Sequence, residues 1–279
     1  MASVVVVAHP AKATGVAQDI VRWLQEQGHE VRVPEDDAAT LGLAEWGRPE
    51  EKLADGADLA VSLGGDGTML RAVDLVCGAG VPVLGVNIGH LGYLTEVDPH
   101  DLRSALSRFF AGEHDIEARM TLEVAIESSL TPHTALNEAV LEKTVSGHTV
   151  RVAASIDGRP FISYAADGLI VATPTGSTAY NLSARGPIVS PRHRAILLTP
   201  ASPHMLFDRA LVLDPVESIR LEVIGDRPAS LVVDGRSLGT LEPGDALRCT
   251  AGAADARLVT FGGRDFHGIL KSKFGLADR

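Results

Sequence analysis

The chain has 279 residues, of which 45% are hydrophobic and 4% aromatic, and it carries a formal charge of −11 at pH 7. This length suffices for one large domain or two ordinary ones, and the many small aliphatic residues favour the core of an α/β sheet. A strongly acidic chain lacks the clustered basic face that nucleic acids and membrane surfaces require, so neither is an expected partner. Any phosphate-bearing ligand must be held locally, by backbone N–H groups or by a divalent cation.

The cysteines and the first residues bear on the cellular compartment. Cys77 and Cys249 lie in apolar contexts, which favours reduced core residues over a disulfide. The opening residues carry no basic region, and the apolar run from Val4 to Ala8 is too short for a signal sequence or a membrane span. The sequence therefore predicts a cytoplasmic protein.

The first third of the chain alternates short aliphatic runs with amphipathic segments. This pattern is typical of parallel strands joined by crossover helices. A helix is expected to begin at Pro99, with Asp98 as its N-cap, and to continue through Leu102, Leu106 and Phe109 to Gly112. Residues 1–117 are therefore predicted to form a Rossmann-like α/β domain. Its strands are expected at residues 4–7, 30–33, 58–63 and 81–86.

Beyond about residue 115, apolar and polar residues alternate, as in half-buried strands. Asp157-Gly158 and Asp234-Gly235 are typical of hairpin turns, and neither turn need be catalytic. Residues 118–255 are therefore predicted to form a mostly antiparallel β domain. The remaining residues, 256–279, are predicted to be a tail with a strand at 257–261 and a basic helix at 266–274. The alternating runs of the β domain are residues 122–126, 150–156, 219–223 and 231–233.

A glycine-rich turn, Gly64-Gly65-Asp66-Gly67-Thr68, lies between a predicted strand and a predicted helix. Its glycines allow close approach of a ligand, and a helix N-terminus presents unpaired N–H groups, so Gly64, Gly65, Gly67 and Thr68 form a candidate phosphate cradle. Asp66 is suited to accept the proton of a hydroxyl that attacks a phosphate. The alternative is a tight strand-to-helix connection in which Asp66 is only an N-cap. Arg71, one helical turn further on, could contact a phosphate or be a solvated surface residue.

Two further segments combine polar groups with apolar surroundings. Asn137-Glu138 offers an amide and a carboxylate suited to an adenine edge and ribose hydroxyls. The alternative is that one of the pair only satisfies neighbouring backbone. Residues 164–183 combine Asp167, a buried strand and a hydroxyl-rich turn before a helix start. This segment is either a polar loop that surrounds a nucleotide or an ordinary capped loop with Tyr180 in the core.

Taken together, these segments resemble the NAD kinase family over nearly the whole chain. The resemblance rests on five blocks in the same order, namely Gly64–Arg71, Gly80–Gly92, Asn137-Glu138, Asp167–Tyr180 and Leu197–His204. It implies an N-terminal α/β domain, a C-terminal β domain and a tail that returns to the first domain. It also implies transfer of a phosphoryl group from ATP or polyphosphate to the 2′-hydroxyl of the adenosine ribose of NAD, with Mg²⁺ and in a homodimer or homotetramer.

The resemblance assigns roles to individual residues. Asp66 is the proton acceptor, Gly67 lies against the nucleotide, and Asn137 and Glu138 bind the adenosine half of NAD. Asp167 belongs to the nicotinamide side, and no protein side chain is assigned as a direct metal ligand. Basic contacts to the ligand are implied for Arg71 and His148, and a further contact for Arg236. The dinucleotide pocket is lined by Thr178, Ala179, Tyr180, Asn181, Leu182 and Ser183.

The sequence departs from the family pattern at two places. Arg185 replaces a glycine that is often found there, and Ala8-His9-Pro10 lacks the polar pattern expected of the first turn. Either change could alter donor preference or activity. Two rival functions remain: a catalytically silent NADP(H)-binding sensor, and a lipid or small-alcohol kinase that shares the glycine turn. The lipid kinases generally place an asparagine soon after this turn, where the present chain has Met69-Leu70-Arg71.

Overall fold

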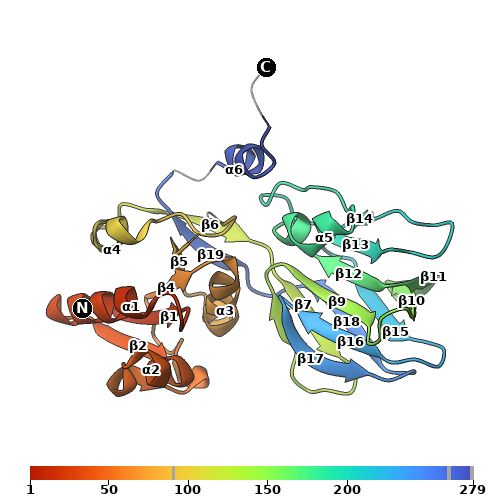
Figure 1. Cartoon of the computed structure of the whole chain (residues 1–279), viewed down its shortest axis with the longest axis horizontal. Coiled ribbons are helices and arrows are strands. Elements are labelled where there is room, and N and C mark those ends of the chain that lie inside the picture. Colours follow the sequence, from red (N-terminus) through yellow and green to blue (C-terminus); the bar gives the residue numbers. More distant parts are fainter. Residues whose placement is uncertain (90–91, 263–264, 277–279) are drawn as a thin grey trace. The chain divides into compact units, whose positions relative to one another are not determined.

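The computed structural model describes residues 1–89, 92–262 and 265–276. The chain forms two compact units, one comprising Met1–Ala118 with Ala256–Arg279 and the other Arg119–Asp255 (Figure 1). The first has a parallel sheet with helices and the second has antiparallel sheets, which confirms the predicted fold class. The sequence places the divisions after residues 117 and 255, and the units divide after Ala118 and Asp255.

The first unit is built on a seven-stranded sheet in the order β3-β2-β1-β4-β5-β19-β6. Its strands are β1 (Ser3–Ala8), β2 (Glu30–Pro34), β3 (Gly47–Arg48), β4 (Leu59–Gly64), β5 (Val83–Asn87), β6 (Asp115–Arg119) and β19 (Ala256–Thr260). Its α-helices are α1 (Thr14–Glu26), α2 (Glu35–Leu41), α3 (Asp66–Val76), α4 (Leu102–Phe110) and α6 (Phe266–Lys273). Short 3₁₀ segments are η1 (Ala44–Trp46), η2 (Glu50–Lys52), η3 (Cys77–Ala79) and η4 (Pro99–Asp101).

The two central strands, β1 and β4, are buried along their whole length. Parallel strands covered on both faces need continuous apolar runs, and Val4 to Val7 supply one. Strand β1 pairs in parallel with β2 on one side and with β4 on the other. The strand order therefore reverses beside β1, and ligands of α/β sheets bind at such a switch point, at the carboxyl ends of the strands.

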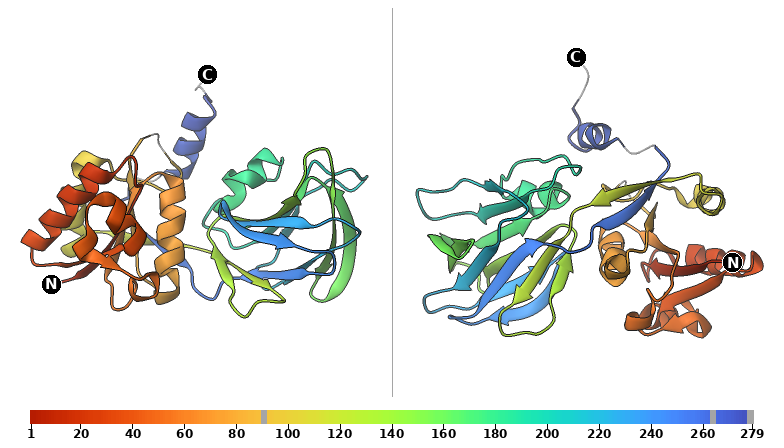
Figure 2. Two further views of the ribbon diagram at one scale, coloured as in Figure 1. Left: turned by 60° about the horizontal axis from the view of Figure 1, so that its bottom comes forward. Right: turned by 180° about the vertical axis from the view of Figure 1, so that it is seen from behind.

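The C-terminal tail joins this sheet, because Leu258 in β19 pairs in parallel with Val83 in β5. Figures 1 and 2 show the blue β19 beside the yellow β6, although these strands are far apart in the sequence. The tail therefore completes the sheet of the first unit.

The second unit contains two six-stranded sheets, ordered β11-β10-β15-β18-β7-β8 and β14-β13-β12-β9-β16-β17. Side chains from both sheets, including Val152 of the first and Leu169 of the second, share one apolar core. The strands are β7 (Leu122–Ile126), β8 (His133–Ala135), β9 (Glu138–Lys143), β10 (Val150–Ile156), β11 (Arg159–Ala166), β12 (Gly168–Ala172), β13 (Ile196–Ala201), β14 (Leu211–Leu213), β15 (Ile219–Val223), β16 (Ala229–Val233), β17 (Arg236–Leu241) and β18 (Ala246–Ala251). Two short helical segments, η5 (Gly176–Thr178) and α5 (Tyr180–Ser183), follow β12.

Most local predictions are confirmed. The predicted hairpin turns join β10 to β11 and β16 to β17, and Asp157 and Asp234 have φ of 49° and 47°, which suits two-residue turns of the hairpin type. Both cysteines are buried and unbridged. Asp98 occupies the predicted N-cap position and Pro99 is the first helical residue, but the Asp98 side chain makes no capping hydrogen bond with any described residue, and the first turn is a 3₁₀ segment that precedes α4. None of the helices in the described part of the chain is long and apolar enough to span a membrane.

Candidate active site

A cavity of about 410 Å³ lies at the switch point of the first unit. This volume is within the range of small-molecule sites, roughly 300–1,000 Å³. The cavity is bounded by the segments that follow β1, β4 and β5, and these segments are bonded to one another. The N–H of His9 donates to the Leu63 carbonyl, and the N–H of Ile88 donates to the Gly64 carbonyl, each at 2.9 Å. The lining residues are Ala8, His9, Pro10, Lys12, Gly65, Gly67, Thr68, Arg71 and Ile88.

Asp66 is the first residue of α3, and its side chain does not act as an N-cap. Gly65 occupies the cap position in an extended conformation. The Asp66 carboxylate instead accepts two backbone hydrogen bonds, from the N–H of Tyr93 to Oδ2 and from the N–H of Leu94 to Oδ1, both at 2.9 Å. Asp66 remains partly exposed. The carboxylate is therefore held in one orientation by the segment of Tyr93 and Leu94, and this contact was not predicted from the sequence.

The glycines around Asp66 have different physical roles. A Cβ on Gly64 would lie 2.1 Å from Thr68 Oγ1, and a Cβ on Gly92 would lie 2.1 Å from Asp66 Oδ1. These two glycines allow close packing inside the protein. No described atom lies within 4 Å of a Cβ built on Gly65 or Gly67, and both residues line the cavity. Those two glycines therefore leave backbone open to a ligand.

Arg71 lines the cavity, but its guanidinium group is already paired with two carboxylates. Its Nη1 lies 2.6 Å from Asp37 Oδ1, and its Nη2 lies 3.5 Å from Glu50 Oε1. The Asp37 side chain is almost fully buried, so this carboxylate is a close and poorly solvated partner. Arg71 is therefore neither the solvated surface residue of the alternative interpretation nor an unopposed positive charge.

In the second unit, Asp234 organises the start of β9. Its carboxylate accepts the backbone N–H groups of Leu136, Asn137 and Glu138, at 2.7, 2.8 and 3.0 Å. The Asp234 N–H donates in return to the Glu138 carbonyl at 3.0 Å. Sequence reasoning identified Asp234 only as a turn residue, and the Asp-Gly signature gave no sign of this second role.

Glu138 is buried, with 8% of its surface exposed. Burial, together with the negative charge of Asp234, raises the pKa of Glu138 to about 8, and a backbone hydrogen bond from Tyr180 opposes the rise. Its Oε2 atom has no hydrogen-bond partner among the residues that the structure describes. At neutral pH this carboxyl is mostly protonated, so it can donate to a ligand oxygen as well as accept.

The segment after β12 packs closely against Asn137 and is hydrogen-bonded to it. A Cβ on Gly176 would lie 2.1 Å from the Asn137 carbonyl oxygen, and the Asn137 carbonyl also accepts the N–H of Thr173 at 2.9 Å. Tyr180 is 39% exposed, so the interpretation that placed it in the core is wrong. The structure therefore brings Asn137, Glu138 and the η5–α5 segment together.

Asn181 has an internal role in this segment. Its side-chain amide donates to the carbonyls of Ser177 and Pro187 and accepts from the Thr199 hydroxyl. The residue is completely buried, and Gly186 packs against its amide. Of the predicted pocket residues, Thr178, Ala179 and Leu182 are partly buried, while Ser183 is exposed.

Arg185 has a φ of 64°, in the left-handed region that favours glycine. A glycine would adopt this backbone conformation without strain, which explains why the family pattern has a glycine at this position. The side chain of Arg185 is exposed, so the departure is explained by neither packing nor burial.

The three remaining predicted contacts lie at the ends of strands. Asp167, between β11 and β12, pairs with Lys143 at 2.7 Å. His148 is exposed in the turn between β9 and β10. Arg236 is exposed at the start of β17, two residues after Asp234.

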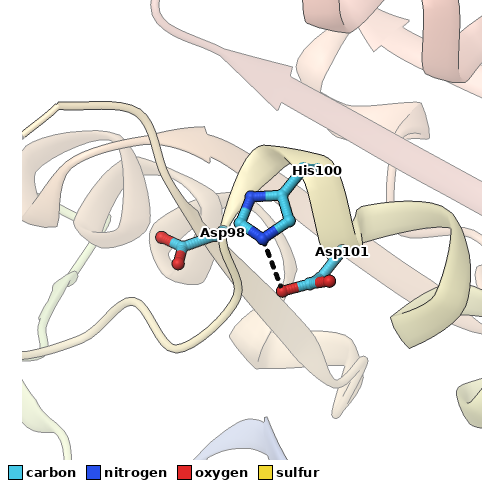
Figure 3. Close-up of side chains that lie close together, drawn as sticks. All are labelled: Asp98, His100 and Asp101. Carbon is cyan, nitrogen blue, oxygen red and sulfur yellow. Dashed lines mark ion pairs between the residues drawn. The ribbon is translucent and has the colours of Figure 1, made fainter.

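A further group of polar residues lies outside the cavity. Asp98, His100 and Asp101 have potential ligand atoms within 4.8 Å of one another, and all three side chains are exposed. Figure 3 shows His100 facing Asp101, with Nε2 3.2 Å from Oδ2. Exposed acidic groups of this kind are common without a metal, and none of the three lines the cavity at Asp66.

A parallel sheet with a glycine-flanked, backbone-anchored aspartate beside a cavity at its switch point is suited to a nucleotide-dependent phosphotransferase. Two family models match the chain: the ATP-NAD kinase N-terminal domain over residues 4–114 and the ATP-NAD kinase C-terminal domain over residues 136–261. The chain therefore belongs to the NAD kinase family, whose members phosphorylate NAD.

Individual relatives agree with this assignment. The NAD kinase of Moorella thermoacetica is 41% identical over 261 residues, which is 92% of this chain and 83% of the relative. The NAD kinase of Syntrophotalea carbinolica is 36% identical and covers 97% of this chain and 96% of its own. The crystal structure of yeast NADH kinase complexed with NADH superimposes with a TM-score of 0.88 at 27% identity, covering 100% of this chain and 89% of that one. An NAD kinase from Archaeoglobus fulgidus in complex with ATP gives a TM-score of 0.78 at 25% identity, covering 99% and 100%.

Proposed function

We propose that Asp66 is the base that activates the 2′-hydroxyl of the adenosine ribose of NAD. The 2′-oxygen forms a bond to the γ-phosphorus of ATP, and the bond from that phosphorus to the β,γ-bridging oxygen breaks. The hydroxyl proton passes to the Asp66 carboxylate, and NADP and ADP are the products. The observation that carries this proposal is the fixed carboxylate of Asp66, which stands in the chain between Gly65 and Gly67, two residues that line the cavity of the switch point.

The two backbone hydrogen bonds suit this role. Each carboxylate oxygen has two lone pairs, so accepting one N–H leaves each with capacity for the ribose hydroxyl. A base held in one orientation loses little entropy when the substrate arrives.

On the acceptor side, the proposed NAD contacts are those of the second unit. The protonated carboxyl of Glu138 and the amide of Asn137 offer donors and acceptors to the adenosine half. Asp167, Tyr180 and the rest of residues 178–183, with His148 and Arg236, complete the proposed set. The complex of yeast NADH kinase with NADH supports a dinucleotide as the ligand.

On the donor side, Gly65 and Gly67 offer open backbone at the start of α3 for the phosphates of ATP. The ATP complex of the Archaeoglobus fulgidus enzyme supports this donor. Polyphosphate is a second proposed donor, because it presents the same phosphoanhydride chemistry.

The residues around the cavity fit a magnesium ion that arrives on the donor phosphates. None of the lining residues in the described part of the chain is a carboxylate, and Asp66 is the one acidic residue of the glycine turn. Mg²⁺ keeps several waters and uses substrate phosphates as ligands, so it needs few protein ligands. When bound, it neutralises part of the phosphate charge. A cytoplasmic location and a homodimer or homotetramer stay predictions.

The test of the base is Asp66→Asn, with Asp36→Asn as a matched control. Asp36 is exposed on α2 and lies outside the cavity. We expect Asp66→Asn to lower kcat for NADP formation by roughly 10²- to 10⁴-fold, since general base catalysis contributes about this much. NAD binding by calorimetry should persist, which separates lost chemistry from lost folding. Normal turnover by Asp66→Asn would refute the assignment, and NADP binding without any turnover by the unmodified chain would favour the silent sensor.

A further inference from the structure

The basic side chains at the cavity of the first unit differ in whether a carboxylate already pairs with them. Three residues with basic side chains line this cavity: His9, Lys12 and Arg71. Arg71 is opposed by Asp37 and Glu50, as described above. In a chain with a formal charge of −11, a site for a polyanionic donor needs at least one local positive charge that is not already neutralised.

Lys12 meets this requirement. Its side chain is exposed and forms no ion pair with any described residue. None of the described residues that line the cavity has a carboxylate, so no lining side chain competes for the ammonium group.

The segment that carries Lys12 is held against the glycine turn. The His9 N–H donates to the carbonyl of Leu63, the residue before Gly64. The His9 carbonyl accepts the N–H groups of Lys12 and Ala13, at 3.2 and 3.0 Å, and His9 Nδ1 accepts the N–H of Ala11 at 3.2 Å. Lys12 is therefore attached to a fixed turn at the carboxyl end of β1, across the switch point from Gly65 and Gly67.

We propose that Lys12 binds the phosphate chain of the donor and is a determinant of donor affinity in this enzyme. This inference rests on the proposed function, because it takes the cavity lined by Gly65 and Gly67, the residues on either side of Asp66, as the donor site. The ammonium group places a positive charge on one side of the phosphates, and the open N–H groups at the start of α3 lie on the other side. Ala8-His9-Pro10 lacks the polar pattern expected of the first turn, and Lys12, two residues after Pro10, supplies a charged group in its place.

The proposal is tested with Lys12→Met, which keeps the aliphatic stem and removes the charge. We expect KM for ATP to rise roughly 10- to 100-fold, as for the loss of one charge-assisted hydrogen bond, while KM for NAD changes less than about twofold. Lys12→Arg, which keeps the charge, should recover most of the affinity. The control Lys52→Met removes an exposed lysine that does not line the cavity and should leave both KM values unchanged.

Binding measured without turnover separates this proposal from the assignment of the base. In the Asp66→Asn background, ATP affinity by calorimetry should weaken by a similar factor when Lys12→Met is added. An unchanged affinity there, or a KM for ATP within about twofold of the unmodified enzyme, overturns the role of Lys12. Failure of Asp66→Asn to reduce kcat would refute the base alone, because the binding comparison does not depend on chemistry.

Discussion

Gly92 lies so close to Asp66 that a Cβ at position 92 would be 2.1 Å from Asp66 Oδ1 and 2.8 Å from its Cγ. Gly92 immediately precedes Tyr93 and Leu94, whose N–H groups bind the same carboxylate. The segment can approach the carboxylate along its backbone only because this residue has no side chain. The orientation of the proposed base therefore depends on a glycine outside the glycine turn.

Gly92→Ala should displace the Asp66 carboxylate without removing it. We expect kcat to fall by roughly 100-fold, because a misplacement of about 1 Å in a reacting group has effects of this size. KM for NAD should change little. Steady-state kinetics with both substrates checks this expectation.

The matched control for this substitution is Gly78→Ala. No described atom lies within 4 Å of a Cβ at Gly78, and its φ is not in the left-handed region. This variant should keep nearly full activity. Equal kcat values for the two variants would show that Gly92 has no special relation to the base.

The buried carboxyl of Glu138 should make stability depend on pH. Its pKa is raised to about 8 in the folded chain from its ordinary value of 4.5, so between these values the folded state binds more protons than the unfolded state. Stability from this group is therefore fully present below about pH 4.5 and is lost as pH rises through about 8. Glu138→Gln should remove this part of the pH dependence.

The measurement is the free energy of unfolding by urea, for both proteins, at several values between pH 5 and about 9. As pH rises, the free energy of unfolding of the unmodified chain should fall relative to that of Glu138→Gln. An exposed control, Glu242→Gln, should give a difference that is constant over this range. A constant difference for Glu138→Gln would contradict the raised pKa.

Arg185 is expected to reduce stability through its backbone. Left-handed φ costs a residue with a Cβ about 1–2 kcal/mol, whereas glycine adopts it freely but loses about 0.5–1 kcal/mol more entropy on folding. Arg185→Gly should therefore increase the free energy of unfolding by up to about 1 kcal/mol. NADP formation with ATP, run beside the denaturation curves, will report any effect on donor use.

Arg192→Gly is expected to have the opposite effect on the free energy of unfolding. Arg192 is exposed, and it is not among the described residues with positive φ. Its replacement should lower the free energy of unfolding by about 0.5–1 kcal/mol, since only the entropy cost remains. Destabilisation of equal size by both substitutions would remove the backbone explanation for Arg185.

The sequence by itself was sufficient for the fold class, about half of the strands, both hairpin turns and the family. These depend on signals within a few residues: apolar runs, alternation, Asp-Gly pairs and the glycine turn. It was insufficient for α2, whose seven residues begin with three acidic side chains and are too short to display a helical period. It also left open whether Asp66 is only a helix cap.

The tertiary structure decided what each polar group touches. Asp66 finds its donors 27 and 28 residues away, and Asp234 holds backbone groups 96 to 98 residues earlier in the chain. Arg71 is neutralised by Asp37, 34 residues before it, which leaves Lys12 as the free charge among the described residues at the cavity. No local pattern encodes such pairs, because they form only when the strand order brings distant segments to one edge of a sheet.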